Sequence, residues 1–279
     1  MRNLLYLVPS YCYFGERIKC SITAKNSKSN IVIIMKAKKF LNVAVLALLT
    51  GAVVVSCNDS EEQLDVLTDV YAINKKFGNE VKSAPAYYAY ANLPMSSVTV
   101  TIPNNGGNVE LESSPGSMNN MAKEPNDADF KTTLPEKGSY GFTIIGVNGE
   151  TIQVPDVLNY ENLSIPQFTK IKFSGTPFIL ELEWNVIKEA DGYFVKMFDL
   201  DGKLVFSGYN IKPDANKYVI TSSANSGYWS QAAVDGKSYL LHLNAFTNDS
   251  EANLSNYIYN LAEISLVETQ IKWGVNQEN

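Results

Sequence analysis

Few side chains in this sequence have the types and spacing that catalysis needs, and the single histidine limits the chemistry most. His242 is the only histidine among the 279 residues. That excludes a metal site built from several histidines and makes any Ser-His-Asp triad depend on this one residue. Within residues 239–246 it alternates with apolar side chains, which predicts the outward face of a central strand. We therefore expect a solvent-facing sheet residue, with a catalytic base as the alternative.

Two glutamates form the first pair of carboxylates with a catalytic spacing. Glu181 and Glu183 are two residues apart in an alternating segment, so their side chains share one face of a strand with Cβ atoms about 7 Å apart. Such a pair could suit a glycosidase, which uses one carboxyl group as acid and the other as nucleophile or base. Nothing in the sequence marks a cleft around them, so we expect an exposed pair that serves solubility.

The second pair of carboxylates lies in Asp199-Leu200-Asp201-Gly202. This segment begins like a calcium-binding loop, but the later ligands and the closing bidentate glutamate are missing. The same residues suit a tight turn, so we expect a hairpin turn, with a weak calcium site as the alternative. No glycine-rich phosphate loop occurs either. The sequence therefore predicts no catalytic residue, no metal site and no cofactor.

Residues 35–57 are organised like an export signal. Three lysines precede an apolar run over residues 40–55, and the small Ser56 stands directly before Cys57. The ending Val54-Val55-Ser56-Cys57 resembles the lipobox of bacterial lipoproteins. The resemblance implies that residues 35–56 are a signal peptide, that Cys57 is lipidated and that its acyl anchor binds the membrane. An uncleaved transmembrane anchor and a buried helix are the alternatives, although an apolar run of about 16 residues is shorter than the roughly 20 that span a bilayer.

The flanking segments fit an exported, anchored chain. Residues 1–34 show no clear periodicity ahead of the signal, and our hypothesis is that they are a misassigned start and that Met35 is the true initiator. Residues 57–67 read as an acidic tether. Their Asp59-Ser60-Glu61-Glu62 is similar to the acidic signals that send Bacteroidetes lipoproteins to the outer leaflet. That similarity implies a lipid-anchored protein of the outer membrane, exposed at the cell surface.

The charge of the chain after residue 56 excludes one class of partner. Residues 1–56 hold 8 of the 23 basic residues and 1 of the 29 acidic residues, which leaves 15 basic against 28 acidic residues and no arginine. An acidic surface without arginine repels nucleic acid and cannot grip phosphate bidentately, so we expect no nucleic-acid partner. Cys12 and Cys20 precede the signal and Cys57 is the predicted lipidation site, so no disulfide is predicted.

The rest of the chain predicts an all-β fold of two consecutive β-sandwich domains. Short alternating segments are separated by turn signals every 8 to 12 residues. We expect one sandwich over residues 68–163 and a second over residues 164–279. Asn104-Asn105-Gly106-Gly107 predicts a hairpin turn; residues 113–129 predict a loop and residues 155–165 a linker. The expected strands cover residues 70–73, 87–91, 97–102, 109–112, 130–134, 140–147, 150–154, 178–184, 193–198, 204–207 and 239–246.

The second sandwich has the more specific pattern. Residues 178–184 alternate and end at Trp184, a tryptophan suited to a sandwich core. The series W-N-x(5)-A-D-G-Y-x-V, followed by Y-x-L-x-L-x-A from Tyr239, resembles a fibronectin type III module over about residues 164 to 275. The resemblance implies an Ig-like sandwich in which Trp184 is the core tryptophan and Tyr239 the corner tyrosine. Such modules usually serve as spacers or binding platforms.

Aromatic side chains are the best signal for binding. Tyr87, Tyr88 and Tyr90 are clustered, and Tyr228 and Trp229 lie in the long predicted loop over residues 222–236. Flat rings with a polar edge can stack on sugars, so these five residues are candidate ligand-binding residues. The alternative is that the rings simply pack onto the edge of a sandwich.

We therefore expect a non-catalytic, lipid-anchored cell-envelope protein that serves adhesion, scaffolding or glycan binding, with a glycan or an envelope protein as partner. A fimbrillin-like structural subunit is one alternative, because such proteins are also two-sandwich lipoproteins. Their maturation typically uses cleavage at arginine, which this chain lacks after residue 56. An envelope hydrolase is the other alternative, and it would need a cleft of acids that the sequence does not show.

Overall fold

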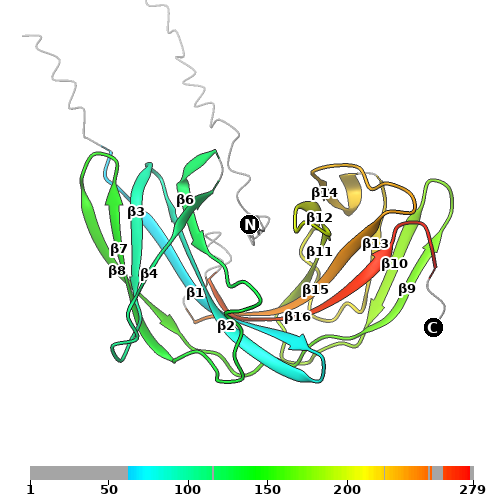
Figure 1. The fold of residues 1–279 in the computed structure, drawn as a ribbon, viewed down its shortest axis with the longest axis horizontal. Coiled ribbons are helices and arrows are strands. Elements are labelled where there is room, and N and C mark those ends of the chain that lie inside the picture. The colour runs from blue at the N-terminus through cyan, green and yellow to red at the C-terminus, as the bar shows by residue number, and fades with distance from the viewer. Residues whose placement is uncertain (1–61, 115, 223, 251, 253–259, 277–279) are drawn as a thin grey trace, which may run out of the picture. The chain divides into compact units, whose positions relative to one another are not determined.

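The strands of this computed structural model pair in three sheets (Figure 1). The structure describes residues 62–276 except residues 115, 223, 251 and 253–259. Predictions that concern residues 1–61, including the signal peptide, Cys57 and most of the tether, lie outside the described residues. Among those described, no helical segment has the length and apolar character that a membrane crossing requires.

The largest sheet has nine strands, and two smaller sheets pack on it. The order in the large sheet is β14 (Gly227–Trp229), β12 (Leu204–Gly208), β11 (Gly192–Asp199), β15 (Ser238–Asn248), β16 (Leu261–Lys272), β1 (Val66–Phe77), β2 (Glu80–Ala91), β6 (Ser117–Lys123), β5 (Glu112–Ser114). The four-stranded sheet has the order β4 (Asn108–Glu110), β3 (Met95–Thr101), β7 (Gly138–Gly146), β8 (Thr151–Leu158). The three-stranded sheet has the order β13 (Lys217–Ile220), β10 (Ile179–Trp184), β9 (Phe168–Ser174), and a 3-10 turn, η1 (Ala224–Ser226), precedes β14.

Two hydrophobic cores make the two sandwiches. In the first, Val70 and Tyr87 of the large sheet pack with Phe142 and Ile144 of the four-stranded sheet. In the second, β11, β12 and β15 pack on the three-stranded sheet through a core that includes Trp184. Because each core lies between two sheets, the all-β, two-sandwich prediction is confirmed. The boundaries at residues 163 and 164 stay a prediction.

Trp184 and Tyr239 occupy the places that the fibronectin type III resemblance implies. Trp184 is 2% exposed and its ring lies 5.5 Å from that of Tyr193. Tyr239 is buried, and its hydroxyl accepts a hydrogen bond of 2.8 Å from the backbone N–H of Val234, five residues upstream. A tyrosine that bonds the backbone shortly before it is the feature of the corner in such sandwiches.

A parallel strand pair joins the two sandwiches. β1 begins the first sandwich and pairs with β16 at the end of the second, in register from Ala72 opposite Glu263 to Lys75 opposite Leu266. Glu263 is 1% exposed, and its carboxylate accepts hydrogen bonds from Asn74 Nδ2 and from the backbone N–H of Glu161. The large sheet therefore runs without a break through both sandwiches.

The turn predicted at residues 104–107 is confirmed by its backbone. β3 and β4 pair with Thr101 opposite Asn108, and Asn104 and Asn105 have φ values of 54° and 60°. Asparagine tolerates this left-handed region better than other residues with a side chain. The next residue, Gly106, has no room for a Cβ, which would lie 2.5 Å from Ile102 Cγ2.

Several element predictions near the first sandwich are wrong. The predicted loop over residues 113–129 contains β6, which pairs with β2 from Tyr87 opposite Lys123 to Tyr90 opposite Asn120. Its polar side chains gave no alternation because backbone pairing near a sheet edge does not require it. The predicted strand over residues 130–134 makes only a bridge between Lys131 and Ser83.

The prediction of a linker over residues 155–165 is also wrong at its start, since β8 runs to Leu158. Pro155 pairs with Gly141 there. The strand tolerates a proline because it is the edge strand of its sheet. Strands β5, β9, β13, β14 and β16 are also missing from the predicted strands, and β14 lies within the predicted loop over residues 222–236.

Candidate functional site

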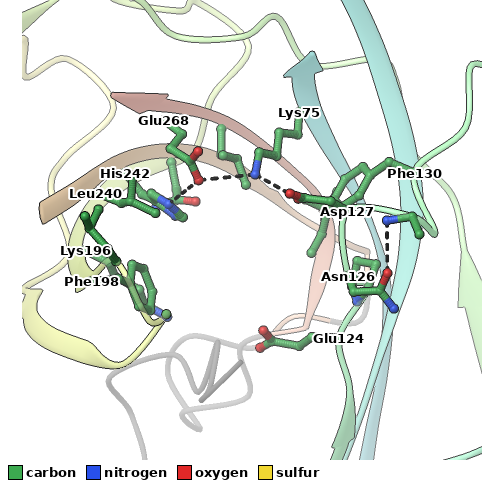
Figure 2. A pocket seen from close by; sticks show the side chains of 17 residues that line it. Lys75, Glu124, Asn126, Asp127, Phe130, Lys196, Phe198, Leu240, His242 and Glu268 are labelled. Atoms are coloured by element: carbon green, nitrogen blue, oxygen red, sulfur yellow. Dashed lines mark hydrogen bonds and ion pairs between the residues drawn. The ribbon is translucent and has the colours of Figure 1, made fainter. Parts of the chain in front are cut away.

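The large sheet has a second face, opposite the two sandwich cores, and a pocket lies on it. In β15, Leu241 and Leu243 point into the second core, so the alternating His242 and Asn244 point to the other side. Figure 2 shows the pocket, whose volume is about 640 Å³. Its floor comes from β11, β15, β16 and β1, and one wall is the segment over residues 124–130 that follows β6.

The strand register places a row of ionisable residues across the floor. Lys196 of β11 is opposite His242 of β15, and His242 is opposite Glu268 of β16. Directly paired side chains on one face of a sheet lie about 5 Å apart. Lys75 of β1 continues the row, because its ammonium lies 3.2 Å from Glu268 Oε2. Residues from four strands far apart in the sequence thus meet in one line.

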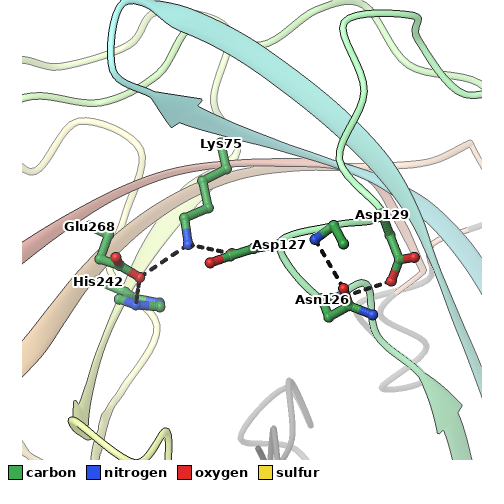
Figure 3. A network of polar contacts seen from close by, with 7 residues as sticks. Lys75, Asn126, Asp127, Asp129, His242 and Glu268 are labelled. Atoms are coloured by element: carbon green, nitrogen blue, oxygen red, sulfur yellow. Dashed lines mark hydrogen bonds and ion pairs between the residues drawn. The ribbon is translucent and has the colours of Figure 1, made fainter.

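Hydrogen bonds and ion pairs hold the row in place (Figure 3). His242 Nε2 lies 2.9 Å from Glu268 Oε2, and the Lys75 ammonium also lies 3.1 Å from Asp127 Oδ1 in the wall. The side chains of Lys75 and His242 are only 14% and 18% exposed, whereas that of Asp127 is 63% exposed. The row is therefore rigid at the floor and open to solvent at the wall.

Contacts around Glu268 set its charge and that of His242. The hydrogen bond from His242, together with the nearby Lys75, lowers the pKa of Glu268 to about 2. Burial lowers the pKa of His242, and the hydrogen bond to Glu268 opposes this effect only in part. At neutral pH the floor therefore holds a carboxylate that accepts a hydrogen bond from a neutral imidazole.

Lys196 and Asn244 are the deepest polar residues of the floor. Lys196 is 2% exposed, and burial lowers its pKa to about 8, which the charge of Glu124 opposes. Its Nζ lies 5.3 Å from the centre of the Phe194 ring. Asn244 is 1% exposed, and within the described residues its side chain makes one hydrogen bond, from Nδ2 to the Phe194 carbonyl at 3.4 Å.

The wall over residues 124–130 is fixed by its own turn and by β2. The backbone N–H of Asn126 donates to Asp129 Oδ2 at 2.9 Å, and Asn126 Oδ1 accepts from the N–H of Ala128 at 2.9 Å. Lys131 and Ser83 exchange backbone hydrogen bonds of 2.8 and 3.0 Å. The wall is thus an ordered part of the site.

Chemically, the pocket offers groups that can bind a polar ligand. Its lining residues include carboxylates, ammonium groups, an imidazole and amides, several of them held by hydrogen bonds. Across the described residues, no group of three or more His, Cys, Asp or Glu side chains could hold a metal ion.

Comparisons with known proteins add little to this picture. No family model matches the chain, and no curated protein matches it. Among solved structures it is similar to a segment of two fibronectin type III domains from chicken tenascin, at 12% identity and a TM-score of 0.24, over 76% of this chain and 98% of that one. It is also similar to a tetra-tandem repeat in the extending region of a large adhesion protein, at 10% identity and a TM-score of 0.23, over 75% of this chain and 50% of that one. Scores this low carry no argument, so the fold assignment rests on the sheets and cores above.

Two of the candidate aromatic residues lie at one end of the large sheet. Tyr228 is 58% exposed in β14, which is the first strand of the sheet order. Its neighbour Trp229 is partly buried: Nε1 donates to the Thr221 carbonyl at 2.9 Å, and the ring lies 4.7 Å from that of Phe206. Tyr228 is therefore available to a ligand, while Trp229 is mainly a packing residue.

The other three candidates lie in β2, with five strands between them and β14. Tyr87 is 4% exposed in the first core, where its ring lies 5.9 Å from that of Tyr140. The Tyr88 hydroxyl donates to Asn120 Oδ1 at 2.9 Å, and Tyr90 is 36% exposed. The structure does not bring this cluster together with Tyr228. Binding at any of these rings stays a prediction, and Tyr87 offers a ligand almost no surface.

The carboxylate pairs have structural partners. Glu181 and Glu183 each lie 2.9 Å from the ammonium of Lys170 on the neighbouring strand, so a cation sits between the two carboxylates. Asp199 Oδ1 accepts hydrogen bonds from the backbone N–H of Asp201 and of Lys203. The prediction of a hairpin turn there is confirmed.

Sequence reasoning placed His242 on the outward face of a central strand but missed the pocket. β15 does lie between β11 and β16, yet the ring is covered by neighbours such as Phe198, whose ring centre is 4.8 Å away. The expectation of a solvent-facing residue is therefore wrong in its degree of exposure. One signal was available, namely a lysine, Lys196, inside the otherwise apolar run of residues 193–198.

Proposed function

We propose that the protein is a non-catalytic, lipid-anchored component of the bacterial outer membrane that serves adhesion or scaffolding at the cell surface. The observation that carries this proposal is the parallel pairing of β1 with β16. Backbone hydrogen bonds across that pair make one sheet out of strands from both sandwiches. Two sandwiches coupled in this way keep a fixed spacing, which suits a part that presents a binding surface at a defined distance from its anchor.

The proposed anchor is an acyl group on Cys57. Residues 58–65 would then form a short acidic connection to β1, which begins at Val66. Acylation with more than one chain meets the two-signal requirement for stable membrane attachment. The membrane is the partner at this end, and a glycan or another envelope protein is the proposed partner of the sandwiches.

Labelling with radioactive palmitate in growing cells tests the anchor. We expect label in the wild-type protein and none in a Cys57→Ser variant, with a Ser60→Ala variant, three residues further on, as the control that keeps its label. Protease treatment of intact cells then tests the location, since a surface protein is degraded while a periplasmic marker survives. Label that persists in Cys57→Ser, or a protein that resists protease on intact cells, would contradict the proposal.

A further inference from the structure

The row of residues on the pocket floor alternates hydrogen-bond donors with acceptors. The Lys75 ammonium and the His242 ring donate to Glu268, and Lys75 also donates to Asp127. Each carboxylate still has free lone pairs for additional donors, because an ionised carboxylate has about four acceptor sites. A ligand group that both donates and accepts fits such a row, and a hydroxyl is that group.

Asn244 adds an independent observation. It is 1% exposed, lines the pocket, and uses one amide hydrogen in a long bond of 3.4 Å to the Phe194 carbonyl. Its Oδ1 accepts no hydrogen bond from the described residues. Among the described residues only Trp184 Nε1 is a fully buried side-chain polar atom without a hydrogen-bond partner, so Asn244 Oδ1 is accessible and can accept a hydrogen bond from a donor in the pocket. The amide is therefore placed for a ligand that offers a hydroxyl or N–H.

Apolar side chains flank the polar row on both sides. On one side, Phe198 and Leu240 are each two residues from a member of the row in their own strand. On the other side, Leu266 and Ile73 are placed in the same way. The ring of a pyranose sugar has the matching form, with C–H groups on its faces and hydroxyls around its edge. A polar line between two apolar strips thus matches a sugar better than it matches a uniformly polar ion.

The charges of the pocket are nearly balanced. Lys75 and Lys196 provide two cations against the carboxylates of Glu124, Asp127 and Glu268. A ligand with a full charge would meet both signs within the same row, so a neutral ligand is favoured. The volume of about 640 Å³ lies within the range of ordinary small-molecule sites.

We propose that this pocket is a binding site for a neutral mono- or disaccharide, held by hydrogen bonds from its hydroxyls to Asn244, Glu268 and Asp127. This site is distinct from the exposed Tyr228 at the end of the sheet. The inference rests on the recognition role proposed above and gives it a ligand class. It does not depend on Cys57, because none of the residues that line the pocket belongs to the anchor or the tether.

Isothermal titration calorimetry with the purified full-length protein tests the proposal. The probes are glucose, galactose, N-acetylglucosamine, maltose, lactose and cellobiose, with glucuronate and glycine as charged comparisons. Two variants report on the pocket. Asp127→Asn changes a side chain that is 63% exposed, so it leaves the fold intact, and Asn244→Leu removes the amide at similar size. Glu181→Gln is the matched control, because it alters a lysine-bonded glutamate on a different sheet.

We expect saturable binding of at least one neutral saccharide. Affinity should fall about tenfold in Asn244→Leu and a few-fold in Asp127→Asn, since each loses a hydrogen bond to the ligand, and stay unchanged in Glu181→Gln. No binding of any neutral probe up to about 10 mM would overturn the proposal. So would binding that both pocket variants leave unchanged, or pocket-dependent binding of glucuronate or glycine alone. Palmitate labelling separates these failures from failure of the anchored role.

Discussion

Asn74 donates its amide hydrogen to the carboxylate of Glu263 across the parallel pair of β1 and β16. Both side chains are buried, and Asn74 Nδ2 also bonds Ser265 Oγ at 3.1 Å. Ser265 in turn donates to the Leu163 carbonyl at 2.6 Å, at the start of the second sandwich. A chain of buried polar groups therefore links the two sandwiches, and it fixes the register of the strands that join them.

Removal of Glu263 is expected to destabilise the whole protein. In Glu263→Ala the buried Asn74 amide loses one of its two acceptors, at a cost of about 1–3 kcal/mol, and the partly buried N–H of Glu161 loses its acceptor as well. We expect the free energy of unfolding in urea to fall by about 3 kcal/mol. Glu183→Ala is the control, because its ion pair with Lys170 is exposed and contributes little to stability. Equal effects of the two substitutions would contradict this role for Glu263.

Lys196 is expected to make stability depend on alkaline pH. Its folded pKa of about 8 lies below the ordinary value of 10.5, so between these values the unfolded chain binds more protons than the folded one. The free energy of unfolding therefore rises with pH across this window and is reduced at pH 7, by about 3 kcal/mol relative to a lysine without this shift. Burial is the main cause, and the groups that face Lys196 are Glu124, His242 and Phe194.

Lys196→Met tests this prediction with a side chain of similar length and no charge. We expect the variant to be at least as stable as the wild type at pH 7, and the rise between pH 8 and 9.5 to be lost. Chemical unfolding of both proteins across that range measures the difference. Tyrosines such as Tyr140, whose pKa is raised to about 12 by burial, change stability in the opposite sense above pH 10, so the comparison stops below that value. A variant that keeps the full rise would show that another group causes it.

The parts of the fold that sequence predicted well are those in which hydropathy and position agree. Trp184 ends an alternating strand, and the pairs of asparagine and glycine at residues 104–107 stand between two strand patterns. Both features are local, so the sequence displays them directly. By contrast, β6 is polar and pairs with β2 through its backbone, and such a strand has no hydropathy signal.

The pocket was not predictable in the same way because its residues come from four separate strands. Lys75 and Glu268 are 193 residues apart in the chain and 3.2 Å apart in space. Only the parallel pairing of β1 with β16 brings them together, and a strand pattern does not reveal its partner. The sequence instead indicated aromatic residues as the candidate binding residues, and one of these, Tyr87, packs in the first core.

Acid is expected to weaken the protein through the Glu268 site. Because the pKa of Glu268 is lowered to about 2, its contribution is present above about pH 4.5 and is lost as the pH falls toward 2. The Glu268 carboxylate is partly solvated, and solvent screens its interactions. We therefore expect it to contribute about 1–2 kcal/mol to the free energy of unfolding. His242, with its pKa lowered by burial, adds a loss in the same direction below about pH 6.5.

Glu268→Gln separates this contribution from those of other acids. The variant should show a flatter fall in the free energy of unfolding between pH 5 and pH 3 than the wild type, as measured by urea unfolding at each pH. Glu112→Gln, which alters an exposed pair with Lys123, should follow the wild-type curve. If Glu268→Gln also follows it, the ion pair and hydrogen bond at Glu268 do not govern the response to acid.

The two neighbouring rings of β14 should behave in opposite ways when each is replaced by alanine. Trp229 bonds the Thr221 carbonyl and contacts Phe206 and Trp273, so Trp229→Ala removes packing and a hydrogen bond and should cost about 2–4 kcal/mol. Tyr228 is 58% exposed, and Tyr228→Ala should change the free energy of unfolding by less than about 0.5 kcal/mol. Loss of glycan-array binding in Tyr228→Ala would therefore report on recognition, whereas the same loss in Trp229→Ala would first reflect a weakened sheet edge. Equal stability of the two variants would contradict the packing role of Trp229, and unchanged glycan binding in Tyr228→Ala would remove that ring from the candidate ligand-binding residues.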